Sequence, residues 1–310
     1  MAASEIVRRI DEAYDKEERG LADAATRLGA IHGSVMPRTY VGPAYGHGTF
    51  RGHPVPRVFV MSINQSRQGQ DVSEDEVRQS MRNIRQDEKG RFKPDGFGPR
   101  ALSANLTRWL LMQCGVDGSG MNPEDVHGLI AYDNYVKWPF DVDSSEPPKE
   151  AWEVFDAINK QIIEVLEPDI ILSLGRPMYD RIYEALNAGS KYEWERAVSG
   201  WCYTIRASWG RCGVGWCYHY SNPIWPNRYW KDLREEGKLP HKAMSLWQGA
   251  EPSSNEVVRA MQEVEDDRDR YPWWGEETYA GSSFTRYNPY QKWIAWQVCR
   301  HLAEGWRESR

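Results

Sequence analysis

Short apolar runs that end in polar residues recur along the chain, and they predict buried β-strands. The first run covers residues 57–63 and is followed by Asn64. A second run, 128–140, ends near Asn134, and a third covers 168–175. The segments GWCYTIRAS and VGWCYHYSNP predict two further strands. The pattern indicates a sheet that is covered on both faces.

Apolar residues at helical spacing lie between these strands and beyond them. They predict helices over residues 4–31, 102–110, 152–166 and 178–186, and more helices in 231–310. The alternation of strands and helices predicts an α/β fold, a three-layer α/β/α arrangement around a central, largely parallel sheet.

Three segments are expected from this pattern. An N-terminal helical extension and a Gly- and Pro-rich loop occupy 1–56, and the α/β/α core occupies 57–230. A C-terminal helical extension, 231–310, is expected to pack on the core.

Composition narrows the class of protein. Hydrophobic residues make up 40% of the 310 residues, which is enough for a core, but no apolar run approaches the roughly 20 residues that span a bilayer. The first 20 residues contain no apolar signal-peptide stretch. An odd number of cysteines, five, and the lack of a C-x-x-C pair argue against a disulfide framework and against a metal or cluster site. We therefore expect a cytoplasmic monomer without membrane contact or cofactor.

Charge and aromatic content bear on the partner. A net charge of −6 argues against a dedicated nucleic-acid coat, so any DNA binding must use a local patch. The chain has 15 Trp and 16 Tyr, which suit stacking on bases or sugars. The alternative is that these residues fill a Trp-rich core.

Polar residues gather at three predicted strand ends: Asn64, Asn134 and the turn SNPIWPNR at 221–228. Parallel strands bring their carboxyl ends to one edge of a sheet, which is where ligands bind in open α/β folds. For Asn64 alone, a turn-forming role explains the residue equally well.

These strand ends resemble motifs of the uracil-DNA glycosylase superfamily. In its mismatch-specific uracil/thymine branch, the first strand ends in GINPG and the last in NPSGLSR, where this chain has SINQS and NPIWPNR. Between them, DNYVKW resembles the family's TNVVKC, and EPDIILSLGRPMYDRI resembles its third strand and the following helix. The resemblance covers roughly residues 57–230 and keeps the family order.

The chain departs from the family at several positions. Trp138 stands where the cluster-binding branch has cysteine, so no iron–sulfur cluster is expected. Gln65 and Ser66 replace Pro and Gly, and Ile224 replaces a serine that holds DNA phosphate in the family. Asn64 stands where the strongest branch has aspartate, and an amide cannot act as a base.

The resemblance implies roles in breaking the bond between a base and deoxyribose. Asn64 and Asn222 fall on catalytic positions, with Asn64 orienting water, and Asn134 reads the edge of a flipped pyrimidine. Asp71 is the nearest carboxylate and a candidate general base, although a helix cap is the better-supported reading. His219 is a candidate donor to the leaving base, and the alternative is an ordinary core or surface histidine.

DNA contacts are implied for three more residues. Trp225 falls where the family has its wedge, with a buried loop anchor as the alternative, and Arg228 and Arg67 would contact phosphate. The family lysine at Lys137 is structural, so a Schiff base is not expected. The resemblance thus implies a monofunctional enzyme that leaves an abasic site in DNA.

The choice of base depends on the first motif. Efficient uracil enzymes exclude thymine with an aromatic residue there, whereas this chain has Ser66 and Gly69, which predicts an open pocket. Aromatic segments such as WERAVSGWCY and YPWWGEETY are candidates to cover a larger base. We expect a bulky modified cytosine in phage DNA, which some similar superfamily members remove as a defence. The alternatives are repair of uracil or mismatched thymine, and a non-catalytic nucleic-acid-binding module; the preference for single or double strands stays open.

Overall fold

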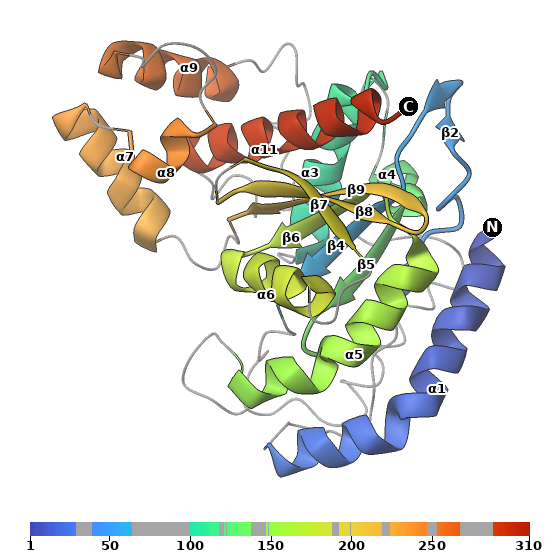
Figure 1. Ribbon diagram of the computed structural model, residues 1–310. Helices are drawn as coiled ribbons and strands as arrows, with labels where there is room; N and C mark the ends of the chain where they lie inside the picture. The colour runs from blue at the N-terminus through green and yellow to red at the C-terminus, as the bar shows by residue number, and fades with distance from the viewer. Residues whose placement is uncertain are drawn as a thin grey trace.

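A seven-stranded sheet forms the centre of the protein (Figure 1). The strand order is β1-β5-β4-β6-β9-β8-β7, with a separate two-stranded hairpin of β2 and β3. The computed structural model describes residues 1–28, 39–63, 99–117, 121, 123–137, 147, 149–187, 192–198, 200–218, 224–237, 239–246, 253–266 and 288–310. The strands of the large sheet are β1 Tyr40–Val41, β4 Val58–Ser62, β5 Ile130–Asn134, β6 Ile170–Leu174, β7 Glu193–Val198, β8 Cys202–Ala207 and β9 Gly210–Cys217. The hairpin strands are β2 Thr49–Phe50 and β3 His53–Pro54.

The sheet is parallel at its centre and antiparallel at its edges. Strands β5, β4, β6 and β9 run parallel, as the apolar runs predict. Strand β1 pairs antiparallel with β5, and β9, β8 and β7 form an antiparallel meander. Only residues 208–209 connect β8 to β9, and so short a connection joins antiparallel strands but never parallel ones. Strand β7 was not predicted from the sequence.

The helices mostly follow the predicted amphipathic segments. Figure 1 shows them on both sides of the sheet, with α7, α8 and α9 grouped beside one end of α11. Helix α4 was not predicted, and α7 begins at Ile224, inside the segment 221–228 that was predicted to be a turn. The helices are α1 Ala3–Arg27, α3 Pro99–Gln113, α4 Pro123–Leu129, α5 Lys149–Leu166, α6 Arg176–Asn187, α7 Ile224–Glu236, α8 His241–Met244, α9 Ser254–Asp266 and α11 Pro289–Glu308.

Alternation along β8 and β9 shows which helix covers which face. Tyr203 on β8 lies against Tyr179 of α6, with ring centroids 4.8 Å apart. Gly215 of β9 points to the opposite face, where a Cβ would come within 2.9 Å of Leu302 and Val298 of α11. The missing side chain therefore lets α11 approach the sheet closely, while α6 packs on the other face.

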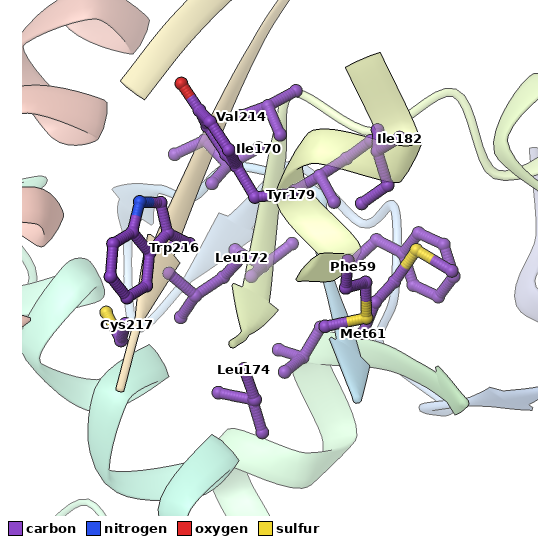
Figure 2. Packing of buried hydrophobic residues seen from close by; sticks show 14 of the residues in the cluster. Phe59, Met61, Ile170, Leu172, Leu174, Tyr179, Ile182, Val214, Trp216 and Cys217 are labelled. Atoms are coloured by element: carbon purple, nitrogen blue, oxygen red, sulfur yellow. The ribbon is translucent and has the colours of Figure 1, made fainter. Parts of the chain in front are cut away.

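One hydrophobic cluster joins nearly all of these elements, from Ile6 in α1 to Trp306 in α11. Figure 2 shows part of it, where side chains of β4, β6 and β9 gather with Tyr179 and Ile182 of α6. The central strands β4, β5 and β6 are buried along their whole length, which explains their continuous apolar sequences. The protein is therefore a mixed α/β protein built around one principal core.

Two further features concern the expected cellular setting. All five cysteines are free thiols. Among the helices that the structure describes, none combines the length and the apolar character needed to cross a bilayer.

Candidate functional site

The ends of β4 and β5 lie side by side at the carboxyl edge of the parallel strands. Ser62 is the register partner of Asn134. Hydrogen bonds continue past the strands, because the amide of Tyr135 donates to the Ser62 carbonyl at 2.8 Å and that of Val136 donates to the Ile63 carbonyl at 2.9 Å. The first motif and the DNYVKW segment are thus joined through their main chains.

The end of β6 packs against the same place. Gly175 follows β6 with φ +126°, a conformation that side chains other than glycine rarely adopt. A Cβ on Gly175 would lie 3.3 Å from Cδ1 of Ile63. The third strand therefore ends in contact with the residue that directly precedes Asn64.

Asn134 is the one predicted base-reading residue that the structure describes in full. The residue is only 6% exposed, and its Oδ1 accepts a hydrogen bond from the hydroxyl of Tyr132 at 3.3 Å. A carbonyl oxygen has two lone pairs, so one acceptor direction remains. The amide side chain carries both a donor and an acceptor, the two functions that the edge of a pyrimidine requires.

Lys137 is fully buried next to Asn134. Its Nζ donates to Oδ2 of Asp133 at 2.6 Å, to the carbonyl of Asn134 at 2.7 Å and to Oδ1 of Asn159 at 2.9 Å. Burial lowers the pKa of this ammonium group, and the Asp133 carboxylate opposes that shift. Because all three protons are used in hydrogen bonds, Lys137 stabilises the structure of this edge and is not placed to act as a nucleophile.

Two aromatic segments were expected to cover a large base, but two aromatic residues of the first one are buried in the core. Trp201 and Tyr203, from WERAVSGWCY, are 1% and 4% exposed. Trp201 stacks on Trp216, with ring centroids 4.3 Å apart and an interplanar angle of 12°. Tyr203 of β8 is covered by Tyr179 and Tyr183 of α6, which packs on that face of the sheet. The segment YPWWGEETY lies outside the described residues.

Helix α7 is held beside this edge by aromatic contacts. Tyr218, which follows β9, packs on Tyr290 of α11, and Tyr290 packs on Tyr229 of α7. Trp225 lies in the first turn of α7. Arg228 is 66% exposed in its side chain and forms a long ion pair with Asp232, at 3.9 Å. The structure thus leaves the Arg228 side chain accessible to solvent.

The other predicted site residues lie outside the described residues. They are Asn64, Ser66, Arg67, Asp71, His219 and Asn222. Their roles stay predictions, although Asn64 directly follows Ile63 and Asn222 lies two residues before α7.

A cavity of about 430 Å³ lies at the opposite edge of the sheet. Its lining includes Arg57, Asp169 and Gly210, which stand at the amino ends of β4, β6 and β9. Arg57 donates to Asp169 at 3.1 and 3.3 Å and to Glu167 at 3.2 Å. Arg57 is thus already paired with two carboxylates of the lining, and none of the predicted site residues that the structure describes lines this cavity. We therefore place the candidate site at the carboxyl edge.

Sequence reasoning missed the polar groups that support Asn134. Asp133 and Asn159 were not identified, nor was Tyr14 of α1, whose hydroxyl donates to Oδ2 of Asp133 at 3.0 Å. A signal was present for one of them, because a carboxylate inside an apolar strand requires a partner. The identity of the partners could not be found in this way, since Tyr14 is 119 residues away.

Comparisons with known proteins add no relative. A scan against protein-family models and a search of the curated proteins each found no match. The resemblance to uracil-DNA glycosylases therefore depends on the sequence motifs alone.

Proposed function

We propose that this protein is a monofunctional DNA glycosylase that flips a pyrimidine out of DNA and hydrolyses its N-glycosidic bond, leaving an abasic site. The proposed substrate is a bulky modified cytosine in foreign DNA, such as phage DNA. The proposal includes a three-layer α/β/α fold, DNA as the partner, and action as a cytoplasmic monomer.

The observation that carries the proposal is the meeting of three motif segments at one edge. Ser62 and Ile63 join the DNYVKW segment through main-chain hydrogen bonds, and Gly175 packs on Ile63. Strands β5 and β6 are the direct neighbours of β4, so the three motif segments follow adjacent strands and lie at one edge of the sheet. Their meeting at the carboxyl ends of parallel strands is typical of a ligand site in an α/β fold.

Asn134 has the chemistry that base reading requires. Its amide supplies one donor and one acceptor to the Watson–Crick edge of a base that has left the stack. Asn64 would orient the attacking water, and Asp71 would act as the base if it does not cap a helix. The transition state resembles an oxocarbenium ion, so fixed dipoles around the sugar contribute most of the catalysis.

In this proposal, residues of helix α7 contact the DNA backbone. Arg228 is exposed, and its long ion pair with Asp232 is easily exchanged for a phosphate. Trp225 in the first turn would fill the space that the flipped base leaves. The ring contact between Tyr229 and Tyr290 packs α7 against α11. This contact would keep the helix in place when its residues bind DNA.

A second candidate function is a non-catalytic nucleic-acid-binding module. It is favoured by the hydrogen bonds that Asp133, the described carboxylate next to Asn134, already accepts. Its Oδ2 accepts from Lys137, Thr39 and Tyr14 at 2.6 to 3.0 Å, so it is not placed to act as a general base. Catalysis in this proposal therefore depends on Asn64 and Asp71.

The test is a panel of DNA duplexes and single strands that contain glucosylated hydroxymethylcytosine, uracil or a thymine mismatch. Alkali-labile abasic sites are measured after incubation, with unmodified DNA as control. Cleavage at the glucosylated base supports the proposal. Cleavage at uracil or mismatched thymine alone would assign a repair enzyme, and binding without cleavage would assign the binding module.

A further inference from the structure

A buried polar network surrounds the main chain of Asn134. The Asp133 carboxylate accepts the amide hydrogen of Asn134 at 2.8 Å, through Oδ1. On the other side, Nζ of Lys137 donates to the Asn134 carbonyl at 2.7 Å. The residue proposed to read the base is therefore held from both sides by the two members of one ion pair.

The ion pair itself is anchored by the amino-terminal segment. Oδ2 of Asp133 accepts from the hydroxyl of Tyr14 in α1 at 3.0 Å and from Oγ1 of Thr39 at 2.6 Å. Both partners are almost fully buried, at 0% and 1% exposure. The Tyr14 ring also lies over the ammonium group of Lys137, with Nζ 5.7 Å from the ring centroid.

The network continues to helix α5. Oδ1 of Asn159 accepts from Lys137 at 2.9 Å, and its Nδ2 donates to the carbonyl of Tyr135 at 2.9 Å. Helix α1 packs on α5, so the two helices that support the network also contact each other. Every proton of the ammonium group is used, which gives the network a single arrangement.

We infer that Tyr14 and Thr39 are positioning residues for Asn134, and that the amino-terminal segment is part of the base-reading site. The inference rests on the proposed function. Each hydroxyl orients Asp133, and Asp133 together with Lys137 sets the direction of the Asn134 main chain. A two-point contact with a base edge tolerates a displacement of only about 0.5 Å, so small shifts of Asp133 alter base selection.

Substitutions of Thr39 give the sharpest test because the position offers a matched pair. Thr39→Val keeps the size of the side chain and removes the hydroxyl, whereas Thr39→Ser keeps the hydroxyl. Tyr14→Phe removes the second hydroxyl. The control is Tyr192→Phe, which removes a hydroxyl bond of 2.9 Å to Glu164, away from the site.

The first measurement is the ratio of excision rates for two pyrimidines of equal size that differ at the Watson–Crick edge, a cytosine type and a uracil type. We expect this ratio to fall about tenfold in Thr39→Val and in Tyr14→Phe. Thr39→Ser and Tyr192→Phe should keep the wild-type ratio. A purely structural role would slow both substrates equally, so an unchanged ratio in Thr39→Val and Tyr14→Phe overturns the inference.

The second measurement is amide hydrogen exchange of the full-length protein without DNA. Thr39→Val should speed exchange at Asn134, while Thr39→Ser keeps the wild-type rate. If the wild-type protein removes no base from any DNA, the proposed function fails. The positioning of Asn134 is then decided by exchange alone: equal exchange rates at Asn134 in all variants overturn it, and faster exchange in Thr39→Val supports it.

Discussion

The two ends of the parallel strands each carry an ion pair, but the pairs differ in burial. At the carboxyl end, Lys137 and Asp133 are 0% and 4% exposed in their side chains and lie 2.6 Å apart. At the amino end, Arg57 and Asp169 are 26% and 24% exposed and lie 3.1 Å apart. The same kind of ion pair is thus buried at the carboxyl end of the strands and partly exposed at the amino end.

The difference in burial shows what each pair is for. A partly exposed pair contributes modestly to stability because water screens it, even where, as here, the arginine binds both carboxylate oxygens. A fully buried pair is costly to form and gains little over an apolar pair, so stability alone does not explain it. We attribute the Lys137–Asp133 pair to the control it has over Asn134, whose main chain it holds on both sides.

The largest effect is predicted for Lys137→Met. Removal of the ammonium group leaves the Asp133 carboxylate buried without its ion partner, so the free energy of unfolding should fall by about 3–5 kcal/mol. Chemical denaturation measures this change. As control, Lys160→Met alters a half-buried lysine of α5 that lies 5.7 Å from the Tyr192 ring, and it should cost less than about 1 kcal/mol. Equal losses in both variants would contradict the account.

A smaller effect is predicted for Gly175→Ala, and Gly210→Ala provides its counterpart at the amino end. The two glycines have φ +126° and +127°, so each substitution should cost about 1–3 kcal/mol of backbone strain. A Cβ at Gly175 also meets Ile63, whereas nothing lies within 4 Å of a Cβ at Gly210. Thermal unfolding should therefore show a similar loss of stability in both variants. The rate of base excision from DNA should decline in Gly175→Ala alone. A lower excision rate in both variants would contradict the functional difference between the carboxyl and amino ends of the parallel strands.

The smallest effect is predicted for Arg57→Gln, which breaks the pair at the amino end. The loss in the free energy of unfolding should be about 1 kcal/mol and should shrink as salt is added, because the groups are partly exposed. The loss in Lys137→Met should not change with salt, since its pair is buried. Denaturation at low and high ionic strength measures both. Salt dependence of the Lys137→Met effect would show that water reaches the carboxyl-end pair.

Sequence patterns predicted the central strands well because those strands are buried on both faces and read as apolar runs. The same patterns did not predict β7, and they gave no direction for β8, because both depend on a tight connection and on pairing at the sheet edge. For the site, the position of Asn134 at a strand end was predicted and is confirmed, whereas its role stays a prediction. Its supporting contacts from Tyr14 and Thr39 were not predictable, since they join segments 119 and 94 residues away from Asp133.

The central claim is that Asn134 selects a base in DNA at the carboxyl edge of the sheet. The most direct measurement compares wild-type protein with Asn134→Ala on DNA that contains glucosylated hydroxymethylcytosine. The Lys137 and Asp133 contacts involve the main chain of residue 134, so the variant should stay folded by circular dichroism. We predict excision by the wild-type protein and a loss of about 10²-fold or more in the variant. Excision at equal rates by both proteins, or no excision by the wild type, would contradict the claim.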